Sequence, residues 1–168
     1  GKIIVDEYLK TSIENIYAAG DCTGKTMLAH YASYQGTIAA ENIAHPDSAK
    51  QANNTCIPNC IFTDPEIASV GLSEDEAKSN AIDIKISKFD FMASGMAHIH
   101  DETDGFVKII SNNKTDQILG ASIIGPKATE LIAVLALAVS THLKTSQIKD
   151  TIFAHPTLSE SIEEALKH

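Results

Sequence analysis

The order of apolar and polar residues predicts two short strands and a long helix in the first part of the chain. Residues 2–5 and 15–19 are apolar runs of strand length, and the second runs into Gly20 and Asp21. A small polar loop follows, and residues 27–44 have the pattern of a helix. Ligands of α/β folds bind beyond the carboxyl ends of strands, so this strand–loop–helix unit is a candidate ligand edge.

The second part of the chain has the pattern of a sheet followed by helices. Residues 82–87 alternate isoleucine with polar residues, which is typical of a strand with one wet face. Phe89 and Phe91 shift this register, which predicts a bulge near Lys88. Further strands are expected at residues 56–63, 67–70, 105–110 and 118–124, and helices at residues 73–80, 128–143, 145–152 and 158–166. The pattern predicts an α+β domain in which helices pack on one side of an antiparallel sheet.

A polar, turn-rich segment at residues 45–54 separates these two parts, and we place the domain boundary there. The expected division is residues 1–45 and residues 46–168. The expected helix 128–143 is apolar nearly all round, so it must be covered on several sides. A domain this small cannot provide that cover alone, which implies a partner surface.

Composition and charge restrict the classes of ligand and partner. The chain has 43% apolar residues, a net charge of −9 and a pI of about 5.1, which argues against nucleic acid as a partner. All 13 basic residues are Lys, so no Arg can grip an anion with two parallel hydrogen bonds. The longest apolar run, residues 131–139, is far shorter than the roughly 20 residues of a membrane span. We expect a soluble chain that is not secreted, because it opens on a strand-like run rather than a signal peptide.

The three cysteines, Cys22, Cys56 and Cys60, suggest a reducing compartment because their number is odd. The spacing of Cys56 and Cys60 fits neither a Cys-x-x-Cys pair nor a recognised zinc pattern. Buried, unreactive thiols are therefore favoured. A metal-binding domain that uses Cys56, Cys60 and a His is kept as an alternative.

His155 is the main candidate for proton chemistry, because a His side chain titrates near neutral pH. It precedes Pro156, which restricts the backbone before it to extended geometry. Glu160 follows in the first turn of the last expected helix, where its carboxylate can accept the proton of one ring nitrogen. The other nitrogen would then act as a base. Thr157 with Glu160 is also a capping box, which would start a helix without any catalysis, and these residues alone favour that structural interpretation.

Several strings in order resemble the flavin-linked disulfide reductases, most closely the dihydrolipoamide dehydrogenases. Residues 155–160, His-Pro-Thr-Leu-Ser-Glu, resemble the catalytic signature of that family. Residues 15–21 resemble its second flavin-contact motif, and residues 27–30 resemble the segment that follows this motif. Residues 61–71 and 118–126 resemble its dimerisation domain. Several motifs in the right order are far more specific than any one of them.

The resemblance implies a role for each part of the chain. Residues 1–45 would be the C-terminal piece of an FAD-binding domain, and residues 46–168 the interface domain of a homodimer. His155 would accept a proton from a substrate thiol, Glu160 would orient its ring, and the His would reach into the partner's active site. The residues implied in FAD binding are Gly20, Asp21, Met27, Leu28, Ala29 and His30.

The resemblance also implies the setting of the reaction. Electrons would pass from a dihydrolipoyl group through a redox disulfide and FAD to NAD. The partners would be the lipoyl domains of 2-oxo acid dehydrogenase complexes, with no nucleic acid and no membrane. The compartment would be the bacterial cytoplasm or the mitochondrial matrix.

The sequence departs from the family in several respects. It has no Gly-x-Gly-x-x-Gly fingerprint for FAD or NAD and no pair of cysteines with four residues between them. We therefore expect a C-terminal portion that neither holds FAD tightly nor turns over alone. Phe153 stands where many relatives carry a second His, and no cysteine lies near the end, which weakens the mercuric reductase branch. A mercuric or glutathione reductase relative, or a non-catalytic dimerisation module, remains an alternative.

Overall fold

The computed structural model describes residues 1–167, which divide into two compact units. The first comprises residues 1–54, and the second begins at Thr55. The boundary expected from the sequence lay at 45/46, and that assignment to family domains stays a prediction. None of the helices in residues 1–167 is long and apolar enough to cross a membrane.

The first unit is built on one long helix, α1 (Ala29–Ala44), with two short 3-10 turns, η1 (Asp21–Thr23) and η2 (Pro46–Ser48). The helix begins two residues later than expected. The amide of Asn42 fastens the surrounding loops, since its Nδ2 donates to the Lys50 carbonyl (2.9 Å) and its Oδ1 accepts from the Lys50 N–H (2.7 Å). A small core lies beside it, made of Leu9, Ile38, Ala39 and Ala52.

The two strands expected at residues 2–5 and 15–19 are wrong. Among the described residues, the first run makes no ladder pairing, and the second makes a single antiparallel bridge from Tyr17 to Lys10, which lies outside both runs. A strand needs a continuous neighbour to pair with, and one bridge does not provide it. Ile3 N–H instead bonds the Cys22 carbonyl (2.8 Å), and both Ile4 and Ile16 are exposed.

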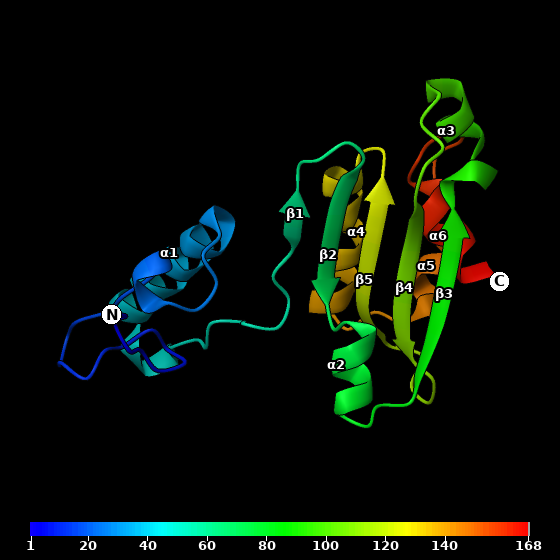
Figure 1. Ribbon diagram of the computed structural model, residues 1–168. Helices are drawn as coiled ribbons and strands as arrows, with labels where there is room; N and C mark the ends of the chain where they lie inside the picture. The colour runs from blue at the N-terminus through cyan, green and yellow to red at the C-terminus, as the bar shows by residue number, and fades with distance from the viewer. Residues whose placement is uncertain (168) are drawn as a thin grey trace. The chain divides into compact units, whose positions relative to one another are not determined.

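The second unit is a five-stranded antiparallel sheet, which confirms the predicted fold class (Figure 1). The strands, in chain order, are β1 (Asn59–Ile61), β2 (Glu66–Gly71), β3 (Ile84–Asp90), β4 (Phe106–Asn112) and β5 (Ile118–Gly125). Their order in the sheet is β1-β2-β5-β4-β3. β4 and β5 form the hairpin that the sequence predicted, and both lie inside the sheet.

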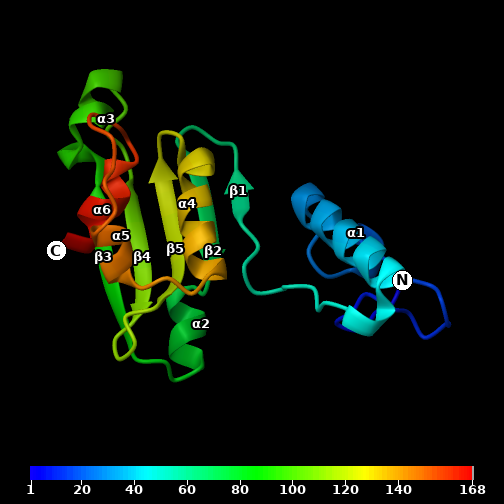
Figure 2. The same cartoon turned by 180° about the vertical axis from the view of Figure 1, so that it is seen from behind.

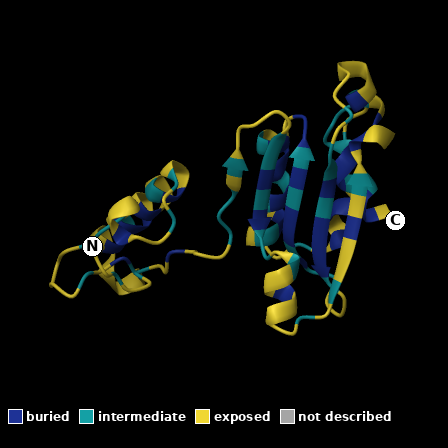
Figure 3. Ribbon diagram, viewed as in Figure 1, coloured by how far each residue is buried: buried dark blue, intermediate teal, exposed yellow. Residues whose placement is uncertain are grey.

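Three helices cover one face of this sheet, as Figure 2 shows from the helix side. They are α4 (Ala128–Ser140), α5 (Thr145–Lys149) and α6 (Glu160–Lys167). α4 packs on β2 and β5, and α6 packs on β3 and β4. Figure 3 shows that the buried residues concentrate in the central strands, which carry much of the apolar core.

Two short helices lie at the ends of the strands, α2 (Glu74–Ser79) and α3 (Gly95–His100). The predicted capping box at the start of α2 is confirmed. Ser73 Oγ accepts from the Glu76 N–H (3.2 Å), and Glu76 Oε2 accepts from the Ser73 N–H (2.8 Å). A 3-10 turn, η3 (Phe91–Ala93), joins β3 to α3.

The bulge expected near Lys88 is wrong, because β3 pairs with β4 residue for residue along its whole length. Phe91 is not part of the strand: it begins η3 and turns into the core, where it is fully buried. The shift in the apolar pattern therefore marks the end of the strand. The helix-covered face of β3 carries Ser87 and Phe89, while Ile86 is 43% exposed.

Candidate functional site

The chain presents His155 in the loop between α5 and α6, before a cis peptide bond to Pro156. The His155 side chain is 82% exposed. Its Nδ1 lies 2.9 Å from Oε1 of Glu160, the first residue of α6. The contact that the spacing of the two residues indicated is therefore present.

The carboxylate of Glu160 has two partners. Oε1 faces the ring of His155, and Oε2 accepts from the Thr157 N–H at 2.7 Å. The bond from the Thr157 N–H to Glu160 is one of the two bonds of the expected capping box, and the Thr157 hydroxyl donates to the Ala154 carbonyl (2.7 Å). The amide of Thr157, and then the His155 ring, lower the pKa of Glu160 below its usual value.

This geometry fixes which ring nitrogen of His155 is available for chemistry. An ionised carboxylate can only accept hydrogen bonds, so Nδ1 must carry the proton that points at Glu160. In the neutral ring, Nε2 then holds a free lone pair. The exposed edge of His155 therefore has the lone pair that a base needs, and the bond to Glu160 favours this tautomer.

A hollow of about 180 Å³ lies against this pair. One side is formed by the His155 loop and α6, and the other by the segment from the end of β3 into α3. The lining residues are Phe89, Ala93, Ser94, Gly95, Met96, His155, Pro156, Glu160, Ser161 and Glu164. The hollow gives a small ligand a place beside the imidazole.

Sequence reasoning missed two parts of this hollow. Glu164 lies one helical turn after Glu160, so the spacing alone could have found it. The wall around Met96 comes from a segment roughly sixty residues earlier, and no local pattern signals that contact.

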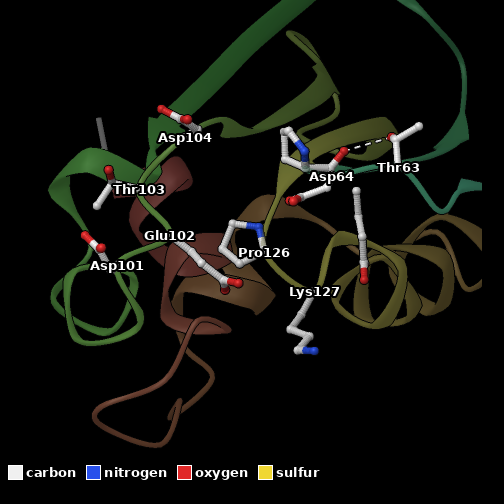
Figure 4. Close-up of a pocket in the computed structure, with 10 residues that line it drawn as sticks. Thr63, Asp64, Asp101, Glu102, Thr103, Asp104, Pro126 and Lys127 are labelled. Atoms are coloured by element: carbon white, nitrogen blue, oxygen red, sulfur yellow. Dashed lines mark hydrogen bonds between the residues drawn. The ribbon is translucent and has the colours of Figure 1, made fainter.

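A larger hollow of about 550 Å³ lies elsewhere in the second unit and does not include His155 (Figure 4). It is acidic, with Asp64, Asp101, Glu102 and Asp104 around its rim and Lys127 among them. Nearby Glu66 is already engaged, because its Oε2 accepts from the Thr129 N–H and hydroxyl. The sequence singled out none of these residues for chemistry.

The residues implied in FAD binding all lie in the first unit, at the start of α1 and in the loop before it. Gly20 adopts a φ of +79°, and an added Cβ would lie 3.2 Å from the Ala32 side chain, so glycine lets the loop approach the helix. Its N–H donates to Oε1 of the buried Gln35 (2.8 Å), which ties the loop to α1. Asp21 is exposed and begins η1. Residues 27–30 run into the first turn of α1, where amide groups favour electron-rich ligands.

These features fit a flavin in part. The close loop, the exposed carboxylate of Asp21 and the helix start are groups that hold hydroxyls and polar ring atoms. No glycine-rich fingerprint for the rest of the cofactor is present in the sequence. Met27 is 71% exposed, so this edge of the unit is open to a ligand.

None of the three cysteines forms a disulfide with another described residue. Cys56 Sγ donates to the Ala136 carbonyl (3.3 Å), and burial raises the pKa of both Cys56 and Cys60. Both are therefore poor nucleophiles. Among the described residues, no three His, Cys, Asp or Glu side chains form a group that could hold a metal, so the metal-binding alternative gains no support.

The sequence matches two profiles of known families. The dimerisation domain of the pyridine nucleotide-disulphide oxidoreductases matches residues 57–166, and the pyridine nucleotide-disulphide oxidoreductase profile matches residues 1–36. The dihydrolipoyl dehydrogenase of Bacillus subtilis (strain 168) is 47% identical over 169 residues, covering 98% of this chain and 35% of that protein. The dihydrolipoyl dehydrogenase of Chlamydia trachomatis is 49% identical over 160 residues, covering 95% and 34%. The chain thus spans about a third of the length of these relatives.

Solved structures agree with this likeness. LpdA from Mycobacterium tuberculosis has a TM-score of 0.92 at 31% identity, covering 99% of this chain and 36% of that chain. The HOCl-induced flavoprotein disulfide reductase RclA from Escherichia coli has a TM-score of 0.90 at 28% identity, covering 99% and 38%.

Proposed function

Because the chain belongs to the pyridine nucleotide-disulphide oxidoreductase family, we propose that it acts as part of a dihydrolipoamide dehydrogenase that oxidises dihydrolipoyl groups. The observation that carries the proposal is the bond between His155 Nδ1 and Glu160 Oε1, 2.9 Å long, on an exposed ring. A non-catalytic dimerisation module would not need this pair.

The role of His155 is to accept a proton. Nε2 takes the proton of a dihydrolipoyl thiol, and the thiolate that remains is the form that attacks a disulfide. The ring becomes an imidazolium, and the ionised Glu160 stabilises that charge through Nδ1. The same bond prevents the ring from rotating away from the substrate.

FAD, when bound, supplies the acceptor for the two electrons of the dithiol, with NAD as the final acceptor. The residues of this chain that would hold it are Gly20, Asp21 and residues 27–30, at the start of α1. The proposal places two copies of the chain in a homodimer, in which each His155 serves the active site of the other copy. Lipoyl domains of 2-oxo acid dehydrogenase complexes are the proposed protein partners.

The test is the variant His155→Ala in the complete enzyme that carries this chain. We expect turnover of dihydrolipoamide to fall by about two to four orders of magnitude, the usual contribution of a positioned base, with flavin content intact. The variant His100→Ala removes an exposed His of α3 that does not line the hollow, and should leave turnover unchanged. An equal loss of flavin and activity in His155→Ala would make His155 a structural residue.

A further inference from the structure

The hollow beside His155 has two chemically different walls. The wall from β3, η3 and α3 is largely apolar, with Phe89 and Met96 both half-buried. The wall from α6 carries two carboxylates, Glu160 and Glu164. No Lys is among the lining residues, so His155, once it holds the substrate proton, is the one side chain of this lining that can carry a positive charge.

The two carboxylates are not equally available. Both oxygens of Glu160 are already bonded, to the His155 ring and to the Thr157 amide. Glu164 makes one ion pair, from Oε1 to Lys167 Nζ at 2.8 Å. Lys167 also binds Glu163 Oε1 at 2.8 Å, so one positive charge is shared by two negative ones. The α6 side of the hollow therefore keeps a net negative charge.

We propose that this hollow takes the aliphatic arm of the dithiol substrate, and that Glu164 is a specificity-determining residue that disfavours arms ending in a negative charge. The inference rests on the proposed function, because it assumes that the dithiol reacts at His155. Phe89 and Met96 supply apolar contact for methylene groups, and the thioether of Met adapts to a flexible chain. A terminal carboxylate would leave water and approach Glu164, whose cation, Lys167, is already shared with Glu163.

The expected size of the effect is modest, because the Glu164 side chain is 35% exposed. Repulsion between two unit charges near contact in water corresponds to roughly a fivefold change in an equilibrium constant. Salt screens such exposed charges over about 10 Å at 0.1 M ionic strength. The preference for a neutral arm should therefore be a few-fold and should shrink at high salt.

The test compares two substrates in the complete enzyme, dihydrolipoamide and dihydrolipoate, which differ only in an amide or a carboxylate at the end of the arm. We expect kcat/KM to favour dihydrolipoamide by roughly fivefold at low ionic strength, and less at high ionic strength. The variant Glu164→Gln should reduce this ratio by about twofold or more, mainly through a lower KM for dihydrolipoate.

Glu163→Gln is the matched control, since it removes one carboxylate from the same Lys167 but lies outside the lining of the hollow. It should leave the substrate ratio unchanged. A second variant, Met96→Lys, puts a cation on the opposite wall and should also favour dihydrolipoate.

The outcomes separate the two proposals. An unchanged ratio in both Glu164→Gln and Met96→Lys, or an equal change in Glu163→Gln, would overturn the role of Glu164 while dihydrolipoamide oxidation still stands. A wild-type enzyme that does not oxidise dihydrolipoamide at all would overturn the proposed function itself. Flavin content and thermal stability of each variant show whether it is folded.

Discussion

At the scale of single residues, the Glu160 carboxylate contacts both the backbone before α6 and the His155 ring. Its Oε2 holds the Thr157 amide just before α6, and its Oε1 holds the His155 ring. The contacts expected from the two interpretations that the sequence left open, a helix start and an oriented base, are therefore both made by this one side chain. These bonds lower its pKa, so folding and protonation of this residue are linked.

That linkage gives a prediction for pH. The pKa of Glu160 is lower in the folded chain than the value of about 4.3 in an unfolded one. Its stabilising effect is therefore complete above the unfolded pKa and is lost as the pH falls through the folded pKa. The difference in unfolding free energy between wild type and Glu160→Gln should be largest near neutral pH and shrink below about pH 4. Urea unfolding at a series of pH values measures it, and a difference that stays constant down to acid pH would contradict the prediction.

Local spacing explains how much of the candidate site the sequence could predict. Glu160 lies five residues after His155 at the start of a helix, and so short a segment leaves few ways for the two side chains to be placed. The wall around Met96 depends on how β3 and α6 pack, which no short window of sequence contains. The contact between His155 and Glu160 was therefore predictable, and the shape of the hollow beside it was not.

At the scale of elements, alternation and periodicity predicted most strands and helices of the second unit but not the strands of the first. The apolar runs at residues 2–5 and 15–19 have strand composition, yet within them the only ladder pairing in the described residues is a single bridge from Tyr17 to Lys10, which lies outside both runs. On β3, alternation could not tell which face the helices would cover, and Ile86 lies on the other face. Composition predicts that a segment can be a strand, whereas its neighbours decide whether and how it is one.

Helix α4 offers a matched pair of leucines that tests the packing. Leu135 is fully buried against the sheet, while Leu137 is 60% exposed. Leu135→Ala should lower the free energy of unfolding by about 2–5 kcal/mol, because it leaves a cavity in the core. Leu137→Ala should change it by no more than about 0.5 kcal/mol. Chemical denaturation at low protein concentration compares them, and similar losses would refute the assigned orientation of α4.

The start of β4 depends on a glycine. Gly105 has a φ of +106°, and a Cβ there would lie 1.9 Å from the Ile124 carbonyl oxygen. Gly105→Ala should therefore cost about 2–4 kcal/mol of stability, from backbone strain and from displacement of β5. Gly95→Ala is the control, because nothing lies within 4 Å of its added Cβ, and it should be neutral or slightly stabilising. Thermal melting curves of the two variants measure the difference. Equal melting temperatures would contradict the close contact between Gly105 and the Ile124 carbonyl.

At the scale of the whole molecule, the order of several motifs identified the family where single motifs were weak. Profile matches over residues 1–36 and 57–166 agree with that identification. The chain spans about a third of its curated relatives, so the complete reaction is proposed for a larger assembly of parts. The sequence carries the proposed base, His155, but neither the cysteine pair nor the glycine-rich loops that the proposed reaction would also need.

The missing cysteine pair and glycine-rich loops predict how the 168-residue chain should behave when it is purified alone. It should be colourless and should bind added FAD only weakly, because Gly20, Asp21 and residues 27–30 are only part of a flavin site. Visible absorbance and quenching of flavin fluorescence measure this. A yellow preparation with one flavin per chain would show that these residues suffice.

The shared carboxylate of Glu160 also limits which substitutions this position can tolerate. Aspartate keeps the charge but is one methylene shorter, so it could reach the Thr157 amide or the His155 ring but not both. Glu160→Asp would therefore lose either the bond that orients the imidazole or the bond to the backbone before α6. To make the two bonds independent, a designer would need a second acidic residue, so that one carboxylate binds the Thr157 amide and the other binds the His155 ring.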